Sequence, residues 1–274
     1  LLDSRGLTRT LGEIDVCRDE QGRPCFSAGN SAAVFRIRLG GRIRSLRCYL
    51  RPMRHLKEIY GQRLLEKELY LHTSPETGVW VDTVLGDWIE GSTLHETVAQ
   101  ASALRDRESL QILVRLFDRL ALALVTDDRA HGDLKPENII VGDDGTLCPI
   151  DFDASYLPAF AGEISPELGT AAYQHPARTA ADFDERIDDY PAALISTALH
   201  ALAEDPTLWD RYGSSDGLLY TPQRIASDPA YRETLALFEK RGMAVQYRIA
   251  QLLTAPTLRL FGLAELLAEA VREK

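Results

Sequence analysis

Polar side chains of the types used in phosphoryl transfer lie on a short loop in the middle of the chain. The run His131–Asn138 reads HGDLKPEN and stands between a helical pattern and a short apolar strand pattern, with Asp133 and Asn138 five residues apart. Asp151 follows the end of the next apolar strand pattern. A divalent metal requires hard oxygen ligands, and an acceptor hydroxyl requires a carboxylate partner. Three oxygen-bearing side chains on two adjacent loops could supply both.

A simpler interpretation is that these residues only form turns, since Asp and Asn are common turn residues. For an isolated Asp-Phe-Asp at 151–153 that interpretation would be preferred. The combination of HGDLKPEN with a second Asp-Phe at this spacing favours the chemical one.

The run HGDLKPENIIV resembles the HRDLKPEN catalytic loop of eukaryotic-type serine/threonine protein kinases. The resemblance implies that Asp133 is the catalytic base that orients the substrate hydroxyl, and that Lys135 contacts the transferred phosphate. It also implies that Asn138, a third catalytic-loop residue, binds Mg²⁺ together with Asp151. ATP and Mg²⁺ are then the expected cofactors, and a serine or threonine of an unknown protein substrate is the expected acceptor.

Two further motifs follow in the order found in that family. Gly169–Pro176 (GTAAYQHP) resembles the GTxxYxxPE end of an activation segment. The run Asp188-Asp189-Tyr190 resembles the Asp-x-Trp/Tyr that opens the central helix of the C-lobe. The resemblance implies that Asp188 braces the catalytic loop through its backbone.

The expected nucleotide-binding residues lie mostly before Gly91. Asp87–Gly91 (DWIEG) resembles the hinge segment, Gly86 would be a small gatekeeper residue, and Ser27–Val34 (SAGNSAAV) resembles the Gly-rich loop. The resemblance implies that the hinge contributes backbone groups, that one residue after the catalytic loop packs beneath adenine, and that the Gly-rich loop contacts the nucleotide. These residues are Asp87, Ile89, Ile140, Ser27, Gly29, Ala32 and Val34.

The phosphate-anchoring side departs from the family. Arg47 stands where the family has the lysine of VAIK, and Ser27 and Ala32 replace two glycines. Arginine keeps the charge but is a planar fork rather than a compact ammonium, and it could equally be an ordinary solvent-facing residue of a strand. Glu58 is the expected partner of Arg47 at the nucleotide, with Glu66 as the alternative.

Other departures concern regulation and class. Gly132 replaces the arginine that receives an activation-loop phosphate in many kinases, so switching by that phosphate is not expected. Asp153 and Ala177 replace the glycine of DFG and the glutamate after Pro176. Such variants also occur in small-molecule phosphotransferases, although the KPE and GTxxYxxP elements favour the protein-kinase branch. An active serine/threonine kinase, a pseudokinase that binds nucleotide or acts as a scaffold, and a small-molecule kinase all stay open.

Elements that would position these residues can be predicted from periodicity. The first part alternates like strands and contains one helical pattern, whereas the part after Gly91 is mostly helical. We therefore expect an α+β, bilobal, protein-kinase-like fold, with an antiparallel sheet and one helix in the N-lobe and a mainly helical C-lobe. The expected single domain, 1–274, divides into an N-lobe (1–86), a hinge (87–91) and a C-lobe (92–274). The expected strands are 33–39, 43–50, 68–72 and 79–88, with a turn at 74–78; the expected helices are 53–66, 106–125, 191–202 and 258–271.

The bulk composition excludes some classes of partner. The formal net charge of −10 argues against nucleic acid and against anionic membranes, which both attract basic surfaces. No apolar run reaches the ~18–20 residues that span a bilayer. The four cysteines form no CxxC pair, so we expect reduced thiols in a cytoplasmic protein.

Overall fold

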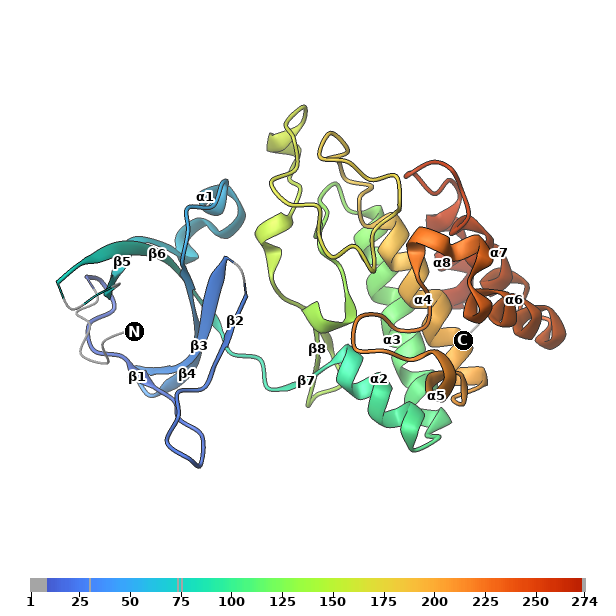
Figure 1. The fold of residues 1–274 in the computed structure, drawn as a ribbon, viewed down its shortest axis with the longest axis horizontal. Coiled ribbons are helices and arrows are strands. Elements are labelled where there is room, and N and C mark those ends of the chain that lie inside the picture. The colour runs from blue at the N-terminus through green and yellow to red at the C-terminus, as the bar shows by residue number, and fades with distance from the viewer. Residues whose placement is uncertain (1–8, 30, 73, 75, 273–274) are drawn as a thin grey trace. The chain divides into compact units, whose positions relative to one another are not determined.

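The computed structural model describes residues 9–29, 31–72, 74 and 76–272. The chain forms two compact units, Leu1–Ile89 and Glu90–Lys274 (Figure 1). The boundary between them falls inside the segment that was expected to be a hinge.

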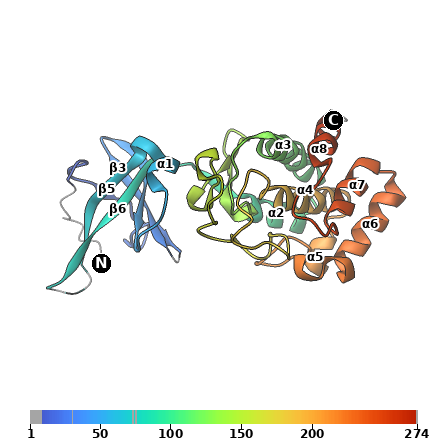
Figure 2. The ribbon, with the colours of Figure 1, turned by 90° about the horizontal axis from the view of Figure 1, so that it is seen from above.

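The N-terminal unit is a curled antiparallel sheet of order β1-β3-β4-β6-β5, with β2 paired to β3 (Figures 1 and 2). Gly40 and Gly41 both have positive φ, as a tight two-residue hairpin between β3 and β4 requires. One face buries a small apolar core that includes Ile37 and Leu46. The strands are β1 (Asp15–Val16), β2 (Phe26–Ala28), β3 (Ala32–Leu39), β4 (Arg42–Tyr49), β5 (Leu64–His72) and β6 (Gly78–Asp87).

The helix predicted over 53–66 is wrong. A short helix α1 covers only Leu56–Tyr60, a 3₁₀ turn follows, and β5 begins at Leu64. Gly61 takes φ +54, outside the right-handed helical region, and ends the helix. Leu64 then pairs with Val84 of β6, so the apolar spacing that indicated one helix spans two elements. The predicted strands are confirmed, with β5 starting earlier than expected. Pro75, in the predicted turn, and Thr73, just before it, lie outside the described residues.

The C-terminal unit is mainly helical, and α3 and α4 pass through its core (Figure 2). Predicted helices 106–125 and 191–202 are confirmed as α3 and α4, whereas the last begins later than expected. This unit also contains a small three-stranded antiparallel sheet of order β7-β8-β9. The elements are β7 (Gly91–Thr93), α2 (Leu94–Ala103), α3 (Arg107–Thr126), β8 (Ile139–Gly142), β9 (Leu147–Pro149), α4 (Asp189–Glu204), α5 (Leu208–Tyr212), α6 (Pro229–Arg241), α7 (Ala244–Leu252) and α8 (Leu263–Arg272).

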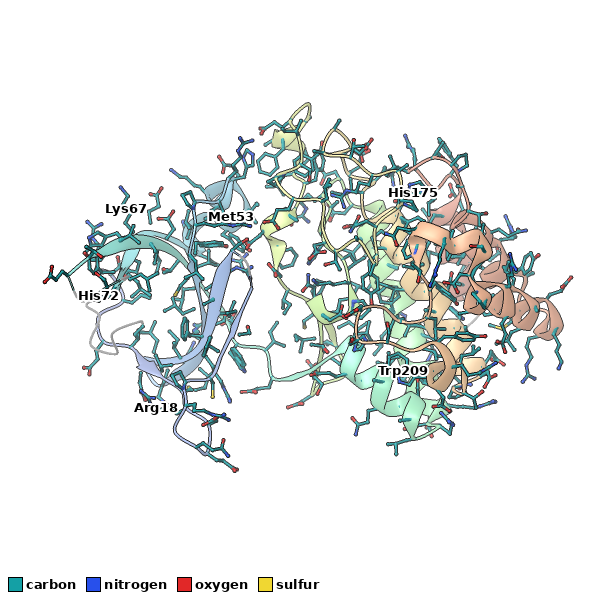
Figure 3. The ribbon with its side chains drawn as sticks, viewed as in Figure 1. Arg18, Met53, Lys67, His72, His175 and Trp209 are labelled. Carbon is teal, nitrogen blue, oxygen red and sulfur yellow. The ribbon has the colours of Figure 1, made fainter. Side chains whose placement is uncertain are left out.

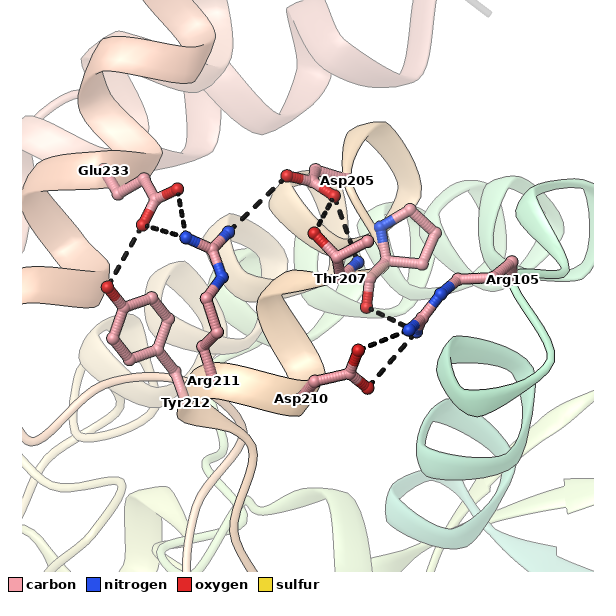
Figure 4. Close-up of polar contacts among 8 residues, drawn as sticks. Arg105, Asp205, Thr207, Asp210, Arg211, Tyr212 and Glu233 are labelled. Atoms are coloured by element: carbon pink, nitrogen blue, oxygen red, sulfur yellow. Dashed lines mark hydrogen bonds and ion pairs between the residues drawn. The ribbon is translucent and has the colours of Figure 1, made fainter.

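An ion-pair network ties α5 to its neighbours (Figure 4). Arg211 binds Glu233 of α6 at 2.7 Å and also lies 3.7 Å from Asp205. Arg105, in the loop before α3, pairs with Asp210 of α5. These side chains are substantially exposed, so each pair adds at most about 1 kcal/mol and together they mainly fix the position of this short helix.

The fold is thus the expected α+β combination of a strand-rich unit followed by a helical one. None of the helices among the described residues has the length and apolar character that crossing a bilayer requires.

Candidate functional site

The start of α4 fixes the backbone of the loop that carries Asp133. Asp188 precedes the helix, is 1% exposed, and accepts hydrogen bonds from the backbone N–H groups of His131 and Gly132, the latter at 3.0 Å. Burial raises the pKa of Asp188, while the hydrogen bonds from the two backbone N–H groups oppose that effect by favouring the ionised carboxylate. The expected contact of Asp188 with the backbone of this loop is therefore present.

His131 joins this loop to the segment that carries Asp151. Its buried ring lies 2.8 Å from the carbonyl oxygen of Ile150 through Nε2, and the N–H of Asp133 donates to its Nδ1 at 3.3 Å. A backbone N–H can only donate, so Nδ1 is the acceptor here and Nε2 is the nitrogen placed to donate to Ile150. The ring also packs on Phe152, with 5.0 Å between ring centroids.

Asp133 is the centre of a hydrogen-bonded cluster. Its Oδ1 accepts from the backbone N–H of Thr170 at 2.6 Å, and its Oδ2 accepts from Nδ2 of Asn138 at 3.2 Å. The ammonium of Lys135 lies 3.3 Å from Oδ2 and donates to Oγ1 of Thr170 at 2.8 Å. Both charged side chains keep a fifth or so of their surface exposed, 19% for Asp133 and 23% for Lys135, so a solute could reach them.

Asn138 and Asp151 stand at the adjoining ends of β8 and β9. The N–H of Ile150 donates to the carbonyl of Asn138 at 2.9 Å, and Asp151 is the next residue. The Asn138 amide nitrogen donates to the backbone carbonyl of Asp133 at 2.9 Å, which leaves the amide oxygen as the atom suited to a cation. Asp151 adopts the left-handed region (φ 67, ψ 65), a strained conformation that is frequent at functional sites.

These two residues suit a metal that takes its other ligands from elsewhere. One carboxylate and one amide oxygen are a partial hard-oxygen set, typical of Mg²⁺ that is also bound by phosphates and water. Within the described part of the chain, no group of three or more His, Cys, Asp or Glu side chains is placed to hold a metal ion. The two side chains therefore fit a Mg²⁺ ion whose remaining ligands come from a bound nucleotide and from water.

Gly132 has no room for a side chain. Its φ is +80, and a Cβ there would lie 2.0 Å from the carbonyl oxygen of Ala154. The turn that follows Asp151 therefore packs directly on the backbone of the loop that carries Asp133. The sequence had indicated only that an arginine is missing from this position.

Arg178 is a site residue that the sequence did not reveal. It is 9% exposed, and its Nη1 donates to the carbonyl of Gly132 at 3.0 Å and to Oε1 of Gln174. Burial lowers the pKa of Arg178, and the neighbouring carboxylates of Asp188 and Asp133 oppose that effect. The only signal in the sequence was its place two residues after the GTAAYQHP motif.

The expected Gly-rich loop is a β-hairpin of the N-terminal unit. Ser27 of β2 pairs with Val34 of β3, and the N–H of Gly29 donates to the carbonyl of Ala32 at 2.9 Å. Asn30, at the tip, lies outside the described residues. A Cβ at Gly29 would meet only one atom, at 4.0 Å, so the local backbone does not demand glycine there.

Arg47 lies on β4, opposite Val34 on one side and Val84 on the other. Its guanidinium carbon is 5.7 Å from the centre of the Tyr49 ring. Glu58 is exposed on α1 and Glu66 is exposed on β5. The pairing of Arg47 with either glutamate stays a prediction, and the expected helix that would present it is little more than one turn.

A buried glutamate of the same unit has another task. Glu68 is 2% exposed, and its Oε1 accepts from the N–H groups of Thr10 and Leu11 at 2.7 and 2.9 Å. It thus fixes residues near the start of the described chain against β5.

The residues expected at the adenine edge are placed in each unit separately. Asp87 ends β6, forms an ion pair with Arg44, and its carbonyl accepts from the hydroxyl of Ser45 at 3.1 Å. A Cβ at Gly86 would lie 2.8 Å from that hydroxyl, a contact that another Ser45 rotamer would relieve. Ile89 is the last residue of the N-terminal unit, and Ile140 of β8 is partly buried in the other. Their contacts with a nucleotide stay predictions.

Comparison with known proteins supports the resemblance. No protein-family model matches the chain. It is 28% identical over 171 residues to CBL-interacting protein kinase 17 of Oryza sativa subsp. japonica, which is 59% of this chain and 35% of that protein. It is 34% identical over 113 residues to serine/threonine-protein kinase PknL of Mycobacterium tuberculosis, which is 39% of this chain and 27% of that protein.

This chain is kinase-like. It spans only about a third of the length of these curated relatives, so the similarity concerns a part of each of them. The details that the comparison leaves open are the arginine at position 47, the use of ATP and Mg²⁺, and the choice of acceptor.

Proposed function

We propose that this kinase-like chain transfers the γ-phosphoryl group of ATP, with Mg²⁺, to a serine or threonine of a protein substrate. The observation that carries the proposal is the cluster around Asp133. A carboxylate oriented by the Thr170 N–H and by Asn138, with the ammonium of Lys135 beside it, is suited to a hydroxyl acceptor and a transferred phosphate.

Each residue of the cluster has a distinct task in this proposal. Asp133 accepts the hydrogen bond of the acceptor hydroxyl and takes its proton as the new phosphorus–oxygen bond forms, while the bond from the γ-phosphorus to the bridging oxygen breaks and ADP leaves. Lys135 places positive charge next to the transferred phosphate, whose oxygens carry negative charge in the transition state. Asn138 and Asp151 would hold Mg²⁺, which when bound neutralises phosphate oxygens and orients the leaving group.

The nucleotide contacts are proposed from position in the motifs. Backbone and side-chain groups of the β2–β3 hairpin, of β4 and of the β6 end would contact ATP, as would one residue of β8. They are Ser27, Gly29, Ala32, Val34, Arg47, Glu58, Asp87, Ile89 and Ile140.

The test is phosphate transfer from labelled ATP to protein acceptors, or to the chain itself, for wild type and Asp133→Asn. Loss of a general base costs about 10²- to 10⁴-fold, so we expect a rate drop of that size with an unchanged fold. Asp143→Asn, at an exposed carboxylate of the β8–β9 turn, is the matched control and should keep the wild-type rate. Equal rates for Asp133→Asn and the control would refute the assigned role.

A pseudokinase is the second candidate, and the N-terminal unit favours it. Arg47 replaces the expected lysine, and Glu58 is exposed on the short helix α1. This candidate predicts that nucleotide binds without turnover. ATP·Mg²⁺ at a hundred times its dissociation constant would stabilise the protein by about 2.7 kcal/mol, visible as a thermal shift.

Arg47→Lys separates the two candidates. A gain of transfer rate in this variant would show that the arginine limits activity in an otherwise competent kinase. A thermal shift with no transfer in either protein would support the pseudokinase. Transfer to hydroxylated metabolites or aminoglycosides, but to no protein, would instead identify a small-molecule kinase.

A further inference from the structure

Most hydroxyl-bearing side chains of the segment between Asp151 and Pro176 have little exposed surface. The segment contains five hydroxyl-bearing side chains, all of them within the described residues. Four are at most 6% exposed, and the fifth, Thr170, accepts a hydrogen bond from Lys135. The four buried ones are Ser155, Tyr156, Ser165 and Tyr173. The two serines of this segment could therefore receive a phosphate only after local unfolding.

The same segment is nevertheless held against the catalytic loop. Gly169 takes φ +70, and a Cβ there would lie 2.7 Å from the carbonyl oxygen of Gly132, so the two backbones are in direct contact. The next N–H, that of Thr170, donates to Asp133. Near the end of the segment, His175 (labelled in Figure 3) lies 3.0 Å through Nε2 from the carbonyl oxygen of Ala255.

Arg178 links the end of the segment to the loop. Its guanidinium bonds both to the carbonyl of Gly132 and to the side chain of Gln174, and it faces the carboxylates of Asp188 and Asp133. Burying a guanidinium is costly unless hydrogen bonds and opposite charges compensate. The two bonds of Nη1 and the nearby carboxylates compensate in part, whereas Nε and Nη2 are buried with no hydrogen-bond partner among the described residues. The buried Arg178 guanidinium thus contacts both the loop and the segment, and it interacts electrostatically with the Asp188 carboxylate that braces the loop.

We infer that Arg178 is a positioning residue that holds the segment from Gly169 to Arg178 on the catalytic loop without any phosphate. The inference rests on the proposed function and adds its regulation: the acceptor side of the site is assembled in the unphosphorylated chain. Gly132 has no room for a side chain, so an arginine cannot stand at that position. Arg178, which belongs to the segment itself, supplies the guanidinium that contacts Gly132. Phosphorylation between Asp151 and Pro176 is therefore not needed for activity.

The decisive measurement is hydrogen exchange at the Thr170 amide, by NMR or in the peptide that covers 168–177. Arg178→Met should speed this exchange by about tenfold or more, because the amide loses its fixed acceptor when the segment detaches. Arg178→Lys should give a smaller increase. Arg186→Met is the matched control, because Arg186 is partly buried and also donates to a backbone carbonyl, that of Val125, away from the catalytic loop.

Unchanged Thr170 exchange in folded Arg178→Met, or an equal increase in Arg186→Met, would overturn the inference. If Arg178→Met does not fold, Arg178→Lys decides by the same criterion. This readout needs no catalytic activity, so it stands even if the proposed function fails.

Kinetics give a second readout. Arg178→Met should lower kcat by about 10- to 100-fold with the KM for ATP unchanged, since the variant disturbs the acceptor side only. Arg186→Met should keep the wild-type kcat. Wild type treated with a phosphatase should keep its rate, and loss of the rate on that treatment would contradict the inference. Absence of transfer in wild type would refute the proposed function alone.

Discussion

Two consecutive aspartates at the start of α4 differ in how their burial is compensated. Asp188 accepts two backbone N–H bonds, whereas Asp189 accepts one long bond, 3.3 Å from the N–H of Leu260. The Oδ1 of Asp189 is buried and has no hydrogen-bond partner among the described residues. Burial raises the pKa of Asp189 to about 7. The protonated form therefore suits the folded protein up to near-neutral pH.

This gives a prediction for stability against pH. The pKa of Asp189 is higher in the folded than in the unfolded chain, so between about pH 4 and 7 the folded state holds more protons and its stability falls as pH rises. Asp189→Asn cannot ionise and removes that loss. The stability of the variant relative to wild type should therefore increase between pH 5 and pH 8, by on the order of 2 kcal/mol in urea unfolding.

Asp143→Asn controls for a general change in net charge. This exposed substitution should leave the pH dependence of unfolding as in wild type. A constant difference between Asp189→Asn and wild type from pH 5 to 8 would show that Asp189 is ionised in the folded protein at both pH values.

At the scale of residues, a motif revealed only those that share a short stretch of chain. HGDLKPEN indicated Asp133, Lys135 and Asn138, and the structure brings all three together with Thr170. Arg178 could not be found this way, because its partner Gly132 is 46 residues away in the chain and the contact depends on the fold.

At the scale of elements, the catalytic loop and the 3₁₀ turn Phe152–Ala154 approach too closely for a side chain between them. Gly132→Ala combines a left-handed backbone with a 2.0 Å approach to the Ala154 carbonyl. We expect it to lower the free energy of unfolding by about 3 kcal/mol or more, measured with denaturant.

Gly145→Ala separates steric overlap from backbone strain. Gly145 lies in the β8–β9 turn with φ +77, but a Cβ there would meet nothing within 4 Å. Its substitution should cost only about 1 kcal/mol, the price of the left-handed backbone. Equal costs at the two positions would show that the loop and the turn separate easily.

A helix or strand could be predicted from the sequence where a single spacing of apolar residues runs along the whole face that packs in the core. The 20-residue helix α3 repeats its apolar residues every three to four positions, and Asp106 caps its start by accepting from Ser109 at 3.0 Å. The region 53–66 failed because Gly61 ends the helix and Leu64 already belongs to a strand. Periodicity does not reveal whether a leucine packs on a helix or pairs in a sheet.

At the scale of the whole molecule, the two units have separate apolar cores of unequal size. The core of the N-terminal sheet has Leu46 near its centre, and the much larger core of the helical unit includes Leu199 of α4. Both leucines are almost fully buried, at 1% and 0% exposure. The same leucine-to-alanine substitution can therefore be made in each core. The regions of the chain that each substitution destabilises can then be compared.

Leu46→Ala and Leu199→Ala should each cost about 2 to 5 kcal/mol, through lost burial and the cavity that remains. If each unit is stabilised by its own core, Leu46→Ala will speed hydrogen exchange in peptides of β3, β4 and β6 and leave α3 and α4 unchanged. Leu199→Ala should do the reverse. Faster exchange throughout the chain in both variants would mean that the units unfold together, and the smaller core would then depend on the larger one for its stability.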